Sequence, residues 1–308
     1  MRPANPGTFV AVDWGTSSFR LWVLDGSGRI LGESRGPDGM VPAARDGFST
    51  VLARHLDRAD APEGAPVVIS GMAGARQGWV ETPYLPVGRD LRDLATAARP
   101  VAFAGRAVHV LPGVSRAERT RADVMRGEET QVLGLLQKSE SVERIVMPGT
   151  HSKWVRVKGR VIVDFSTFLT GELFALLTAQ STLASVMEGN EAPGPTGDFD
   201  DAVRSALDHP AAALERLFGL RAAGLLGFDP PATLRTRLSG LLIGAEVGLA
   251  RARYGTGPVT LVAAGGTCAL YERALRLAGL AVTPEDSETA ARAGLLAAAR
   301  TLHPEILS

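Results

Sequence analysis

The sequence predicts an α/β protein built as two similar lobes. Both halves begin with the same order of strand, glycine-containing break, strand, turn and strand, and helical periodicity fills most of the remainder. The 308 residues also exceed the size at which a single core usually stops growing. We expect residues 1–118 plus 288–308 to form the N-terminal lobe and residues 119–287 the C-terminal lobe.

The first half opens with apolar runs separated by tight turns. Phe9 to Val12 and Phe19 to Leu24 are the first two runs, and Ile30 begins a third. These runs predict three consecutive strands. A helix is expected over Phe48 to Leu56, where Leu52 and Leu56 are four residues apart, and buried strands are expected over 67–70 and 107–111.

The second half repeats the opening. Ile145 to Met147, Trp154 to Val157 and Val161 to Val163 predict three strands in the same order. A further buried strand is expected over 259–263 and an edge strand at 282–283. Helices are expected over 128–136, over 172–183, from about 269, and over 288–302. Residues 190–200 are expected to form a surface loop.

Composition narrows the class of protein. Lys plus Arg and Asp plus Glu both number 33, so the formal net charge is zero, which disfavours a nucleic-acid or membrane-surface partner. The apolar stretch around Leu241 to Ala250 is interrupted by Glu246 and is too short to span a bilayer. The single cysteine, Cys268, excludes an internal disulfide. With no signal-peptide pattern at the N-terminus, we expect a cytoplasmic protein, and a homo-oligomer is left open.

Glycine turns occupy matching positions in the two halves. Gly15-Thr16-Ser17 follows the first strand, Gly149-Thr150-His151-Ser152 follows its counterpart, and Gly265-Gly266 follows a late strand. Such turns direct backbone N–H groups and hydroxyls to one point, which suits phosphate oxygens. Neither a P-loop motif nor a dinucleotide fingerprint is present, which argues against a dehydrogenase.

At these turns the chain resembles the actin-like ATPase superfamily, which includes sugar kinases, chaperone ATPases and actin. Asp13-Trp14-Gly15-Thr16 matches its first phosphate hairpin, Gly149-Thr150 its second, and Gly265-Gly266 its adenosine turn. Longer strings are similar to the 2-dehydro-3-deoxygalactonokinase family, namely VDWGTSSFRLW, GMAGARQGWVETPY, ADVMRGEETQVLG, PGTHSKW and TFLTGELFALL. The resemblance covers nearly the whole chain except about residues 188–228.

The resemblance implies two ribonuclease-H-like lobes with ATP in a cleft between them. It also implies Mg²⁺ as cofactor and phosphoryl transfer to the 6-hydroxyl of 2-dehydro-3-deoxy-D-galactonate, a sugar acid of galactonate breakdown. Two rivals remain open: a kinase of another sugar or keto sugar acid, and a non-enzymatic ATP-binding module of the same fold.

Asp13 is the candidate metal anchor. Its carboxylate directly precedes the first phosphate turn, where it would hold Mg²⁺ beside the phosphates that Gly15, Thr16 and Ser17 bind. The alternative is that Asp13 only ends a strand and accepts hydrogen bonds from the turn.

Asp123 is the candidate general base. We expect it to open the helix that contains Glu128 and Glu129, as the base does in the similar bacterial glucokinases. The alternative role is an N-cap. Arg126, three residues further on, is expected to pair with Asp123 or to bind substrate. For Glu128 and Glu129 a solvated helix face is an equal alternative.

The loop from Gly71 to Trp79 follows the end of a buried strand, where ligands of α/β sheets bind. Arg76 suits a carboxylate bidentately, and the resemblance supplies a keto-acid substrate for it. Trp79 would give a flat apolar surface, although a core role is the alternative. In the second hairpin, His151 and Lys153 are candidate phosphate contacts, with an exposed strand lysine as the alternative for Lys153.

Overall fold

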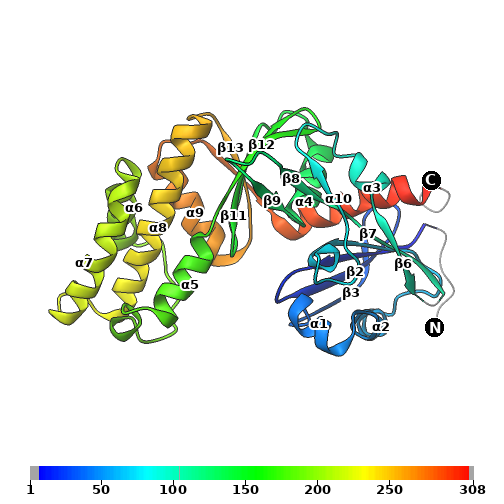
Figure 1. Cartoon of the computed structure of the whole chain (residues 1–308), viewed down its shortest axis with the longest axis horizontal. Helices are drawn as coiled ribbons and strands as arrows, with labels where there is room; N and C mark the ends of the chain where they lie inside the picture. The colour runs from blue at the N-terminus through cyan, green and yellow to red at the C-terminus, as the bar shows by residue number, and fades with distance from the viewer. Residues whose placement is uncertain (1–6, 104, 305–308) are drawn as a thin grey trace. The chain divides into compact units, whose positions relative to one another are not determined.

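The computed structural model describes residues 7–103 and 105–304, and the chain divides into two compact units (Figure 1). Unit 1 takes in the chain up to Val142, Val157–Asp164 and the segment from Ser287 onward. Unit 2 takes in Glu143–Arg156 and Phe165–Asp286.

Unit 1 is organised around a six-stranded mixed sheet in the order β3-β2-β1-β4-β7-β6. Antiparallel pairs join β1 to β2 and β2 to β3, and β4 then lies parallel to β1. The three opening strands and the two later ones are therefore confirmed. The strands are β1 (Phe9–Trp14), β2 (Phe19–Leu24), β3 (Ile30–Gly36), β4 (Val67–Gly71), β6 (Arg99–Phe103) and β7 (Arg106–Val110).

Successive side chains of β1 point to opposite faces of the sheet, and each face has its own apolar core. Val10 and Val12 contribute to the core that also contains Leu52 of helix α2, whereas Phe9 and Ala11 join a second core. That second core includes Leu295 and other side chains of α10 (Ser287–Leu302). The C-terminal helix thus packs in unit 1. The other helices of the unit are α1 (Met40–Asp46), α2 (Phe48–Arg58), α3 (Asp93–Thr96) and α4 (Glu128–Lys138).

Helix α4 packs against α10 through two glycines. A Cβ built on Gly134 would lie 2.0 Å from the Ala290 carbonyl oxygen, and one on Gly294 would lie 1.8 Å from the Thr130 carbonyl oxygen. This close crossing keeps α4 in unit 1, so the expected boundary near residue 118 differs from the division in the structure. An additional three-stranded sheet, which the sequence does not predict, has the order β5-β8-β9, with β5 at Tyr84–Pro86, β8 at Gly113–Arg116 and β9 at Asp123–Met125.

Unit 2 repeats the opening topology in a five-stranded sheet of order β12-β11-β10-β13-β14. Antiparallel β10 and β11 correspond to β1 and β2, and β13 lies parallel to β10 as β4 does to β1. The internal repeat is therefore confirmed, as is the edge position of β14. The strands are β10 (Arg144–Met147), β11 (Ser152–Lys158), β12 (Val161–Phe168), β13 (Val259–Ala263) and β14 (Val282–Asp286).

Helices of unit 2 depart from the prediction at three places. α9 (Gly265–Leu277) begins at the glycine pair rather than near 269. α6 (Gly197–Leu207) occupies the end of the expected loop because Phe199 is fully buried in the unit 2 core. α7 (Ala213–Leu225) and α8 (Pro231–Tyr254) were not predicted, whereas α5 (Thr170–Gln180) was. Within residues 7–103 and 105–304, no helix combines the length and the apolar character that crossing a bilayer requires.

Candidate active site

The first glycine turn forms a tight hairpin between β1 and β2. The Gly15 amide donates to the Ser18 carbonyl oxygen at 2.8 Å, and Thr16 and Ser17 are exposed at the tip. The start of α1 braces the hairpin, because the Met40 amide donates to the Gly15 carbonyl oxygen at 2.9 Å. The tip is thus held by the start of α1, while Thr16 and Ser17 remain exposed, which is compatible with a phosphate turn.

Asp13 lies one residue before the end of β1, opposite Arg20 of β2. Arg20 Nη1 donates to Asp13 Oδ2 at 2.9 Å, and Arg20 Nε lies 3.4 Å from Glu288 Oε1. Burial raises the pKa of Asp13; the ion pair with Arg20 opposes this shift, and the charges of Glu128 and Glu288 add to it. Asp13 Oδ1 accepts no hydrogen bond within the described residues, so one carboxylate oxygen is available for a cation.

Gly71 ends β4 directly beside β1. Its φ of 92° favours glycine, and a Cβ there would lie 2.5 Å from the Trp14 carbonyl oxygen. A Cβ on Gly127 would come within 3.4 Å of the Gly71 Cα. The end of β4 therefore lies against the turn that begins α4, and Gly71 is required for this packing.

The residues of the following loop differ in exposure. Arg76 is exposed, and within the described residues its side chain makes no ion pair or hydrogen bond, which leaves its guanidinium available. The Trp79 ring stacks on Phe48 at 6.2 Å and lies 6.1 Å from Trp14. Trp79 therefore has the core role that was the alternative to a substrate contact, and it anchors the loop.

Arg126 braces the segment that follows this loop, and the Thr82 amide of that segment donates to the Gly74 carbonyl oxygen of the loop at 3.0 Å. Its guanidinium donates to the Thr82 hydroxyl and, at 3.1 Å, to the Thr82 carbonyl oxygen, and it lies 4.2 Å over the Tyr84 ring. The expected pairing with Asp123 is not what the structure shows. Arg126 is therefore a positioning residue for the loop.

The predicted place of Asp123 at a helix start is wrong. Asp123 begins strand β9, pairs opposite Arg116 of β8, and its Oδ2 lies 3.9 Å from Arg116 Nη2. α4 begins only at Glu128, because Gly127 with φ 109° makes the turn from strand to helix. The carboxylate at the helix start is thus Glu128, close enough to Asp13 for its charge to raise the Asp13 pKa.

Glu129 is fully buried rather than solvated. The Gly127 amide donates to both of its carboxylate oxygens, at 2.9 and 2.8 Å, and the Thr130 hydroxyl donates at 3.1 Å. Burial raises the pKa of Glu129 to about 8, and the neighbouring charge of Glu128 acts in the same direction. Glu129 is therefore protonated at neutral pH and stabilises the turn before α4.

The second hairpin, between β10 and β11, is braced by α5. The Glu172 amide donates to the Thr150 carbonyl oxygen at 2.9 Å, and a Cβ on Gly171 would lie 2.3 Å from the Gly149 carbonyl oxygen. His151 Nε2 lies 2.6 Å from Glu172 Oε2. Gly149, Thr150 and His151 are exposed at the tip, as predicted for a phosphate turn.

Ser152 and Lys153 turn inward instead of toward the tip. The Ser152 hydroxyl is buried and donates to Glu246 Oε1 at 2.7 Å, so it is not presented to a ligand. Lys153 is 5% exposed, and its Nζ donates to the His151 carbonyl oxygen at 3.2 Å. The exposed-strand alternative for Lys153 is wrong, since the ammonium group supports the hairpin backbone.

Glu246 of α8 is a buried acceptor that sequence reasoning missed. Ser152 and Trp154 donate to its Oε1, and Thr170 and, at 2.6 Å, Tyr271 donate to its Oε2. Burial raises the pKa of Glu246, and these hydrogen bonds lower it. The carboxylate thereby joins the second hairpin to the start of α5 and to the middle of α9. The only sign of this role in the sequence is that Glu246 interrupts the apolar stretch from Leu241 to Ala250.

A cavity of about 380 Å³ opens beside these elements within unit 2. Gly149, Thr150 and Thr267 contribute its polar wall, and Phe174, Leu242 and Leu270 its apolar wall. Gly265 and Gly266, just before Thr267, are exposed, and a Cβ on either glycine would meet nothing within 4 Å. The second hairpin thus lines one cavity together with Thr267, which directly follows the glycine pair, and this cavity has both a polar and an apolar wall.

The described residues contain no set of three His, Cys, Asp or Glu side chains that would hold a metal ion by themselves. Mg²⁺ in phosphoryl-transfer sites is bound by one or two carboxylates together with water and substrate phosphates. The available oxygen of Asp13 beside the first hairpin fits that mode of binding.

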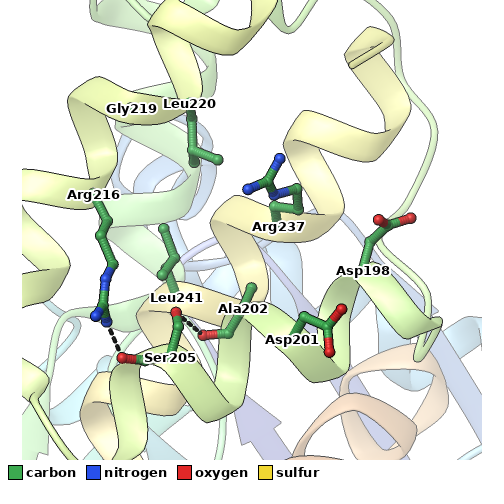
Figure 2. Close-up of a pocket in the computed structure, with 9 residues that line it drawn as sticks. All are labelled: Asp198, Asp201, Ala202, Ser205, Arg216, Gly219, Leu220, Arg237 and Leu241. Atoms are coloured by element: carbon green, nitrogen blue, oxygen red, sulfur yellow. Dashed lines mark hydrogen bonds between the residues drawn. The ribbon is translucent and has the colours of Figure 1, made fainter. Parts of the chain in front are cut away.

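A second cavity, of about 390 Å³, lies among α6, α7 and α8 (Figure 2). Asp198, Asp201, Arg216 and Arg237 line it, but Arg216 donates to the Ser205 carbonyl oxygen and Arg237 pairs with Asp229. It contains none of the predicted nucleotide or substrate residues.

Comparisons with known proteins agree with this architecture. The chain superimposes on component A of the (R)-2-hydroxyglutaryl-CoA dehydratase of Acidaminococcus fermentans with a TM-score of 0.54 at 13% identity, over 98% of this chain and 99% of that chain, a likeness of fold alone. The repeated sheets and their glycine hairpins thus define an actin-like ATPase fold, the class that includes sugar kinases.

More similar proteins identify the family. A family model for 2-keto-3-deoxy-galactonokinase matches residues 13–298. The chain is 44% identical to a probable 2-dehydro-3-deoxygalactonokinase of Rhizobium meliloti, over 97% of this chain and 98% of that one, and 33% identical to the 2-dehydro-3-deoxygalactonokinase of Escherichia coli, over 93% and 96%. A crystal structure of a candidate 2-dehydro-3-deoxygalactonokinase from Sinorhizobium meliloti superimposes with a TM-score of 0.92 at 42% identity, over 96% of this chain and 97% of that chain. The chain belongs to the 2-keto-3-deoxy-galactonokinase family and is a kinase.

Proposed function

We propose that this kinase phosphorylates the 6-hydroxyl of 2-dehydro-3-deoxy-D-galactonate with Mg-ATP, in the cytoplasmic breakdown of galactonate. The observation that carries the proposal is the family match over residues 13–298, which includes both hairpins, the Arg76 loop and the glycine pair. The available guanidinium of Arg76 supports a substrate with a carboxylate.

Each unit carries its own set of candidate nucleotide-binding residues. In unit 1, Gly15, Thr16 and Ser17 bind phosphate oxygens, and Asp13 Oδ1 ligates the cation. In unit 2, the amides of Gly149, Thr150, Gly265 and Gly266 bind the nucleotide, with the Phe174 and Leu242 side chains against its base. Bound Mg-ATP supplies the phosphoryl group and the positive charge that offsets the developing negative charge.

The acceptor hydroxyl requires a base. The resemblance assigns that role to Asp123, whereas Glu128 stands at the helix start, where its charge raises the pKa of Asp13. We assign the proton transfer to Glu128, because Asp123 lies on β9 opposite Arg116. Trp79 anchors the Arg76 loop, and Arg126 braces the segment that follows it.

The test of substrate class is ADP release measured with a panel of 2-keto-3-deoxy sugar acids and the corresponding neutral sugars. The proposal expects the galacto acid to give the highest kcat/KM. A higher value for a neutral sugar would favour the rival sugar kinase, and no ADP release with any member would overturn the proposed substrate class.

Arg76→Lys tests the carboxylate contact directly. Lysine keeps the charge but lacks the planar fork, so we expect kcat/KM for the acid to fall by an amount equivalent to about 2–5 kcal/mol. A carboxyl-free analogue is the matched control and should lose far less. Equal losses on both substrates would mean that Arg76 supports the loop and does not bind the ligand.

A further inference from the structure

One face of α7 carries large apolar side chains that nothing in unit 2 covers. The α7 patch consists of five such residues on the helix and the turn that follows it: Leu214 (79% exposed), Phe218 (68%), Leu225 (64%), Leu226 (65%) and Phe228 (74%). Several large apolar side chains exposed on one helix and the turn after it are unusual on a monomeric protein and mark an interaction site.

The opposite face of α7 is already used. Leu220 is buried in the core that α6 and α8 share, and Arg216 donates to the Ser205 carbonyl oxygen of α6. Figure 2 shows both side chains directed toward these two helices. Leu214, Phe218 and Leu225 follow at intervals of four and seven residues and so form a stripe on the other side of the helix. Figure 1 shows α7 at the outer end of the unit 2 helices.

The size of the α7 patch fits a second copy of the chain. With a surface of about 200 Å² for each large residue, the five exposed fractions correspond to roughly 700 Å². A two-fold axis places the same surface on both partners, which gives about 1,400 Å² in total, within the ~1,200–2,000 Å² of stable interfaces.

Charge does not oppose such a pairing. The formal net charge of the chain is zero, and proteins near zero net charge associate more readily than highly charged ones. Along the stripe, Glu215 and Arg221 carry opposite signs, so two copies bring no excess of like charge. Arg221 is also held in place by the Thr182 carbonyl oxygen, which keeps its charge at the margin of the stripe.

We propose that the α7 patch is the interface of a two-fold symmetric homodimer, formed by α7 of one chain packing against α7 of its partner. The two phenylalanines supply the aromatic anchors that dominate interface energetics. The patch contains no residue of the proposed nucleotide or substrate site, so the dimer and the kinase reaction can be tested separately.

The test is the molecular mass in solution, measured by light scattering and by sedimentation across a hundredfold range of concentration. The wild type should be a dimer, and Phe218→Glu combined with Leu225→Glu should raise the dissociation constant at least a hundredfold. Leu31→Glu, at an exposed apolar residue of β3 in unit 1, is the matched control and should stay dimeric. Circular dichroism and the turnover of the variant show whether it has folded.

A cross-link provides the second readout, which does not depend on the stability of a charged variant. With Cys268 replaced by serine, Phe218→Cys should form a disulfide-linked dimer under mild oxidation, and Leu31→Cys in the same background should not. A monomeric wild type at every concentration would overturn the proposal and leave the α7 patch to another partner. A wild-type dimer that survives both glutamate substitutions would also overturn it, because the interface would then lie elsewhere.

Discussion

At the residue scale, the carboxylates at the start of α4 have separate tasks. Glu128 is half-buried and its charge acts on Asp13, whereas Glu129 is sealed behind the turn at Gly127. A general base has to be ionised and within reach of the acceptor, and Glu129 at neutral pH is neither. Under the proposed function, Glu128 therefore takes part in the chemistry and Glu129 supports the turn.

Glu128→Gln is expected to lower kcat by about 10²-fold or more, with little change in the affinity for ATP, because the base touches the acceptor hydroxyl. Asp123→Asn is the matched variant and should retain most of its kcat. Steady-state kinetics with the sugar acid at saturating ATP decide between them. A large loss for Asp123→Asn together with a nearly active Glu128→Gln would return the role to Asp123.

The raised pKa of Glu129 should make the free energy of unfolding depend on pH. Its pKa of about 8 in the folded state lies above the ordinary value of 4.5, so the folded state binds more protons between these pH values. The free energy of unfolding should therefore fall as pH rises from about 5 to 8. Glu129→Gln cannot ionise and should remove this slope, becoming more stable than the wild type at pH 9 by about 2–4 kcal/mol. Urea titrations at several pH values measure the free energy of unfolding of both proteins. If it depends on pH in the same way in both, Glu129 is not the group responsible.

At the element scale, one side chain of α8 fixes the geometry of several segments. Glu246 accepts hydrogen bonds from β11, the start of α5, and α9, and each of these lines or supports the unit 2 cavity. Partners 25 to 94 residues away in the chain depend on this carboxylate. Its loss leaves buried donors without an acceptor, which costs more than a hydrogen bond contributes.

Glu246→Ala should weaken the binding of ATP at least tenfold and destabilise the fold by about 3–5 kcal/mol, because several donors lose their acceptor together. Glu246→Gln is the control. Its remaining oxygen still accepts from Trp154, and the hydroxyls of Thr170 and Tyr271 can accept from its amide, so the loss should be smaller. Calorimetric titration with ATP gives the affinity. A destabilised Glu246→Ala protein that binds ATP with unchanged affinity would restrict the residue to stability.

At the scale of the whole molecule, the predictable features are those with a local signature. The hairpins at Gly15 and Gly149 follow from glycine between apolar runs, and the repeat follows from their matching positions. The place of Asp123 was wrong because acid residues before a helix resemble caps, while the turn is set by Gly127. α7 was missed because the α7 patch leaves it apolar on both faces, which obscures helical periodicity. Glu246 was missed because its partners are distant in sequence.

The path of the chain leads us to expect that both units unfold together. β11 begins in unit 2 and ends in unit 1, whereas β12 begins in unit 1 and ends in unit 2. A strand cannot unfold over half its length without weakening the ladder of the remainder, so we expect the two cores to unfold as one cooperative unit.

The tryptophans provide a test of this coupling. Three of the four tryptophans lie in unit 1, namely Trp14, Trp22 and Trp79. Helices α5 to α9 all lie in unit 2. Fluorescence therefore reports mainly on unit 1, and far-UV circular dichroism includes the long helices of unit 2. We expect the two probes to give one urea midpoint, and Mg-ATP to raise both by the same amount, since a ligand of the native state stabilises the whole cooperative unit. Separate midpoints, or a shift by ATP in only one probe, would show that the shared strands do not couple the cores.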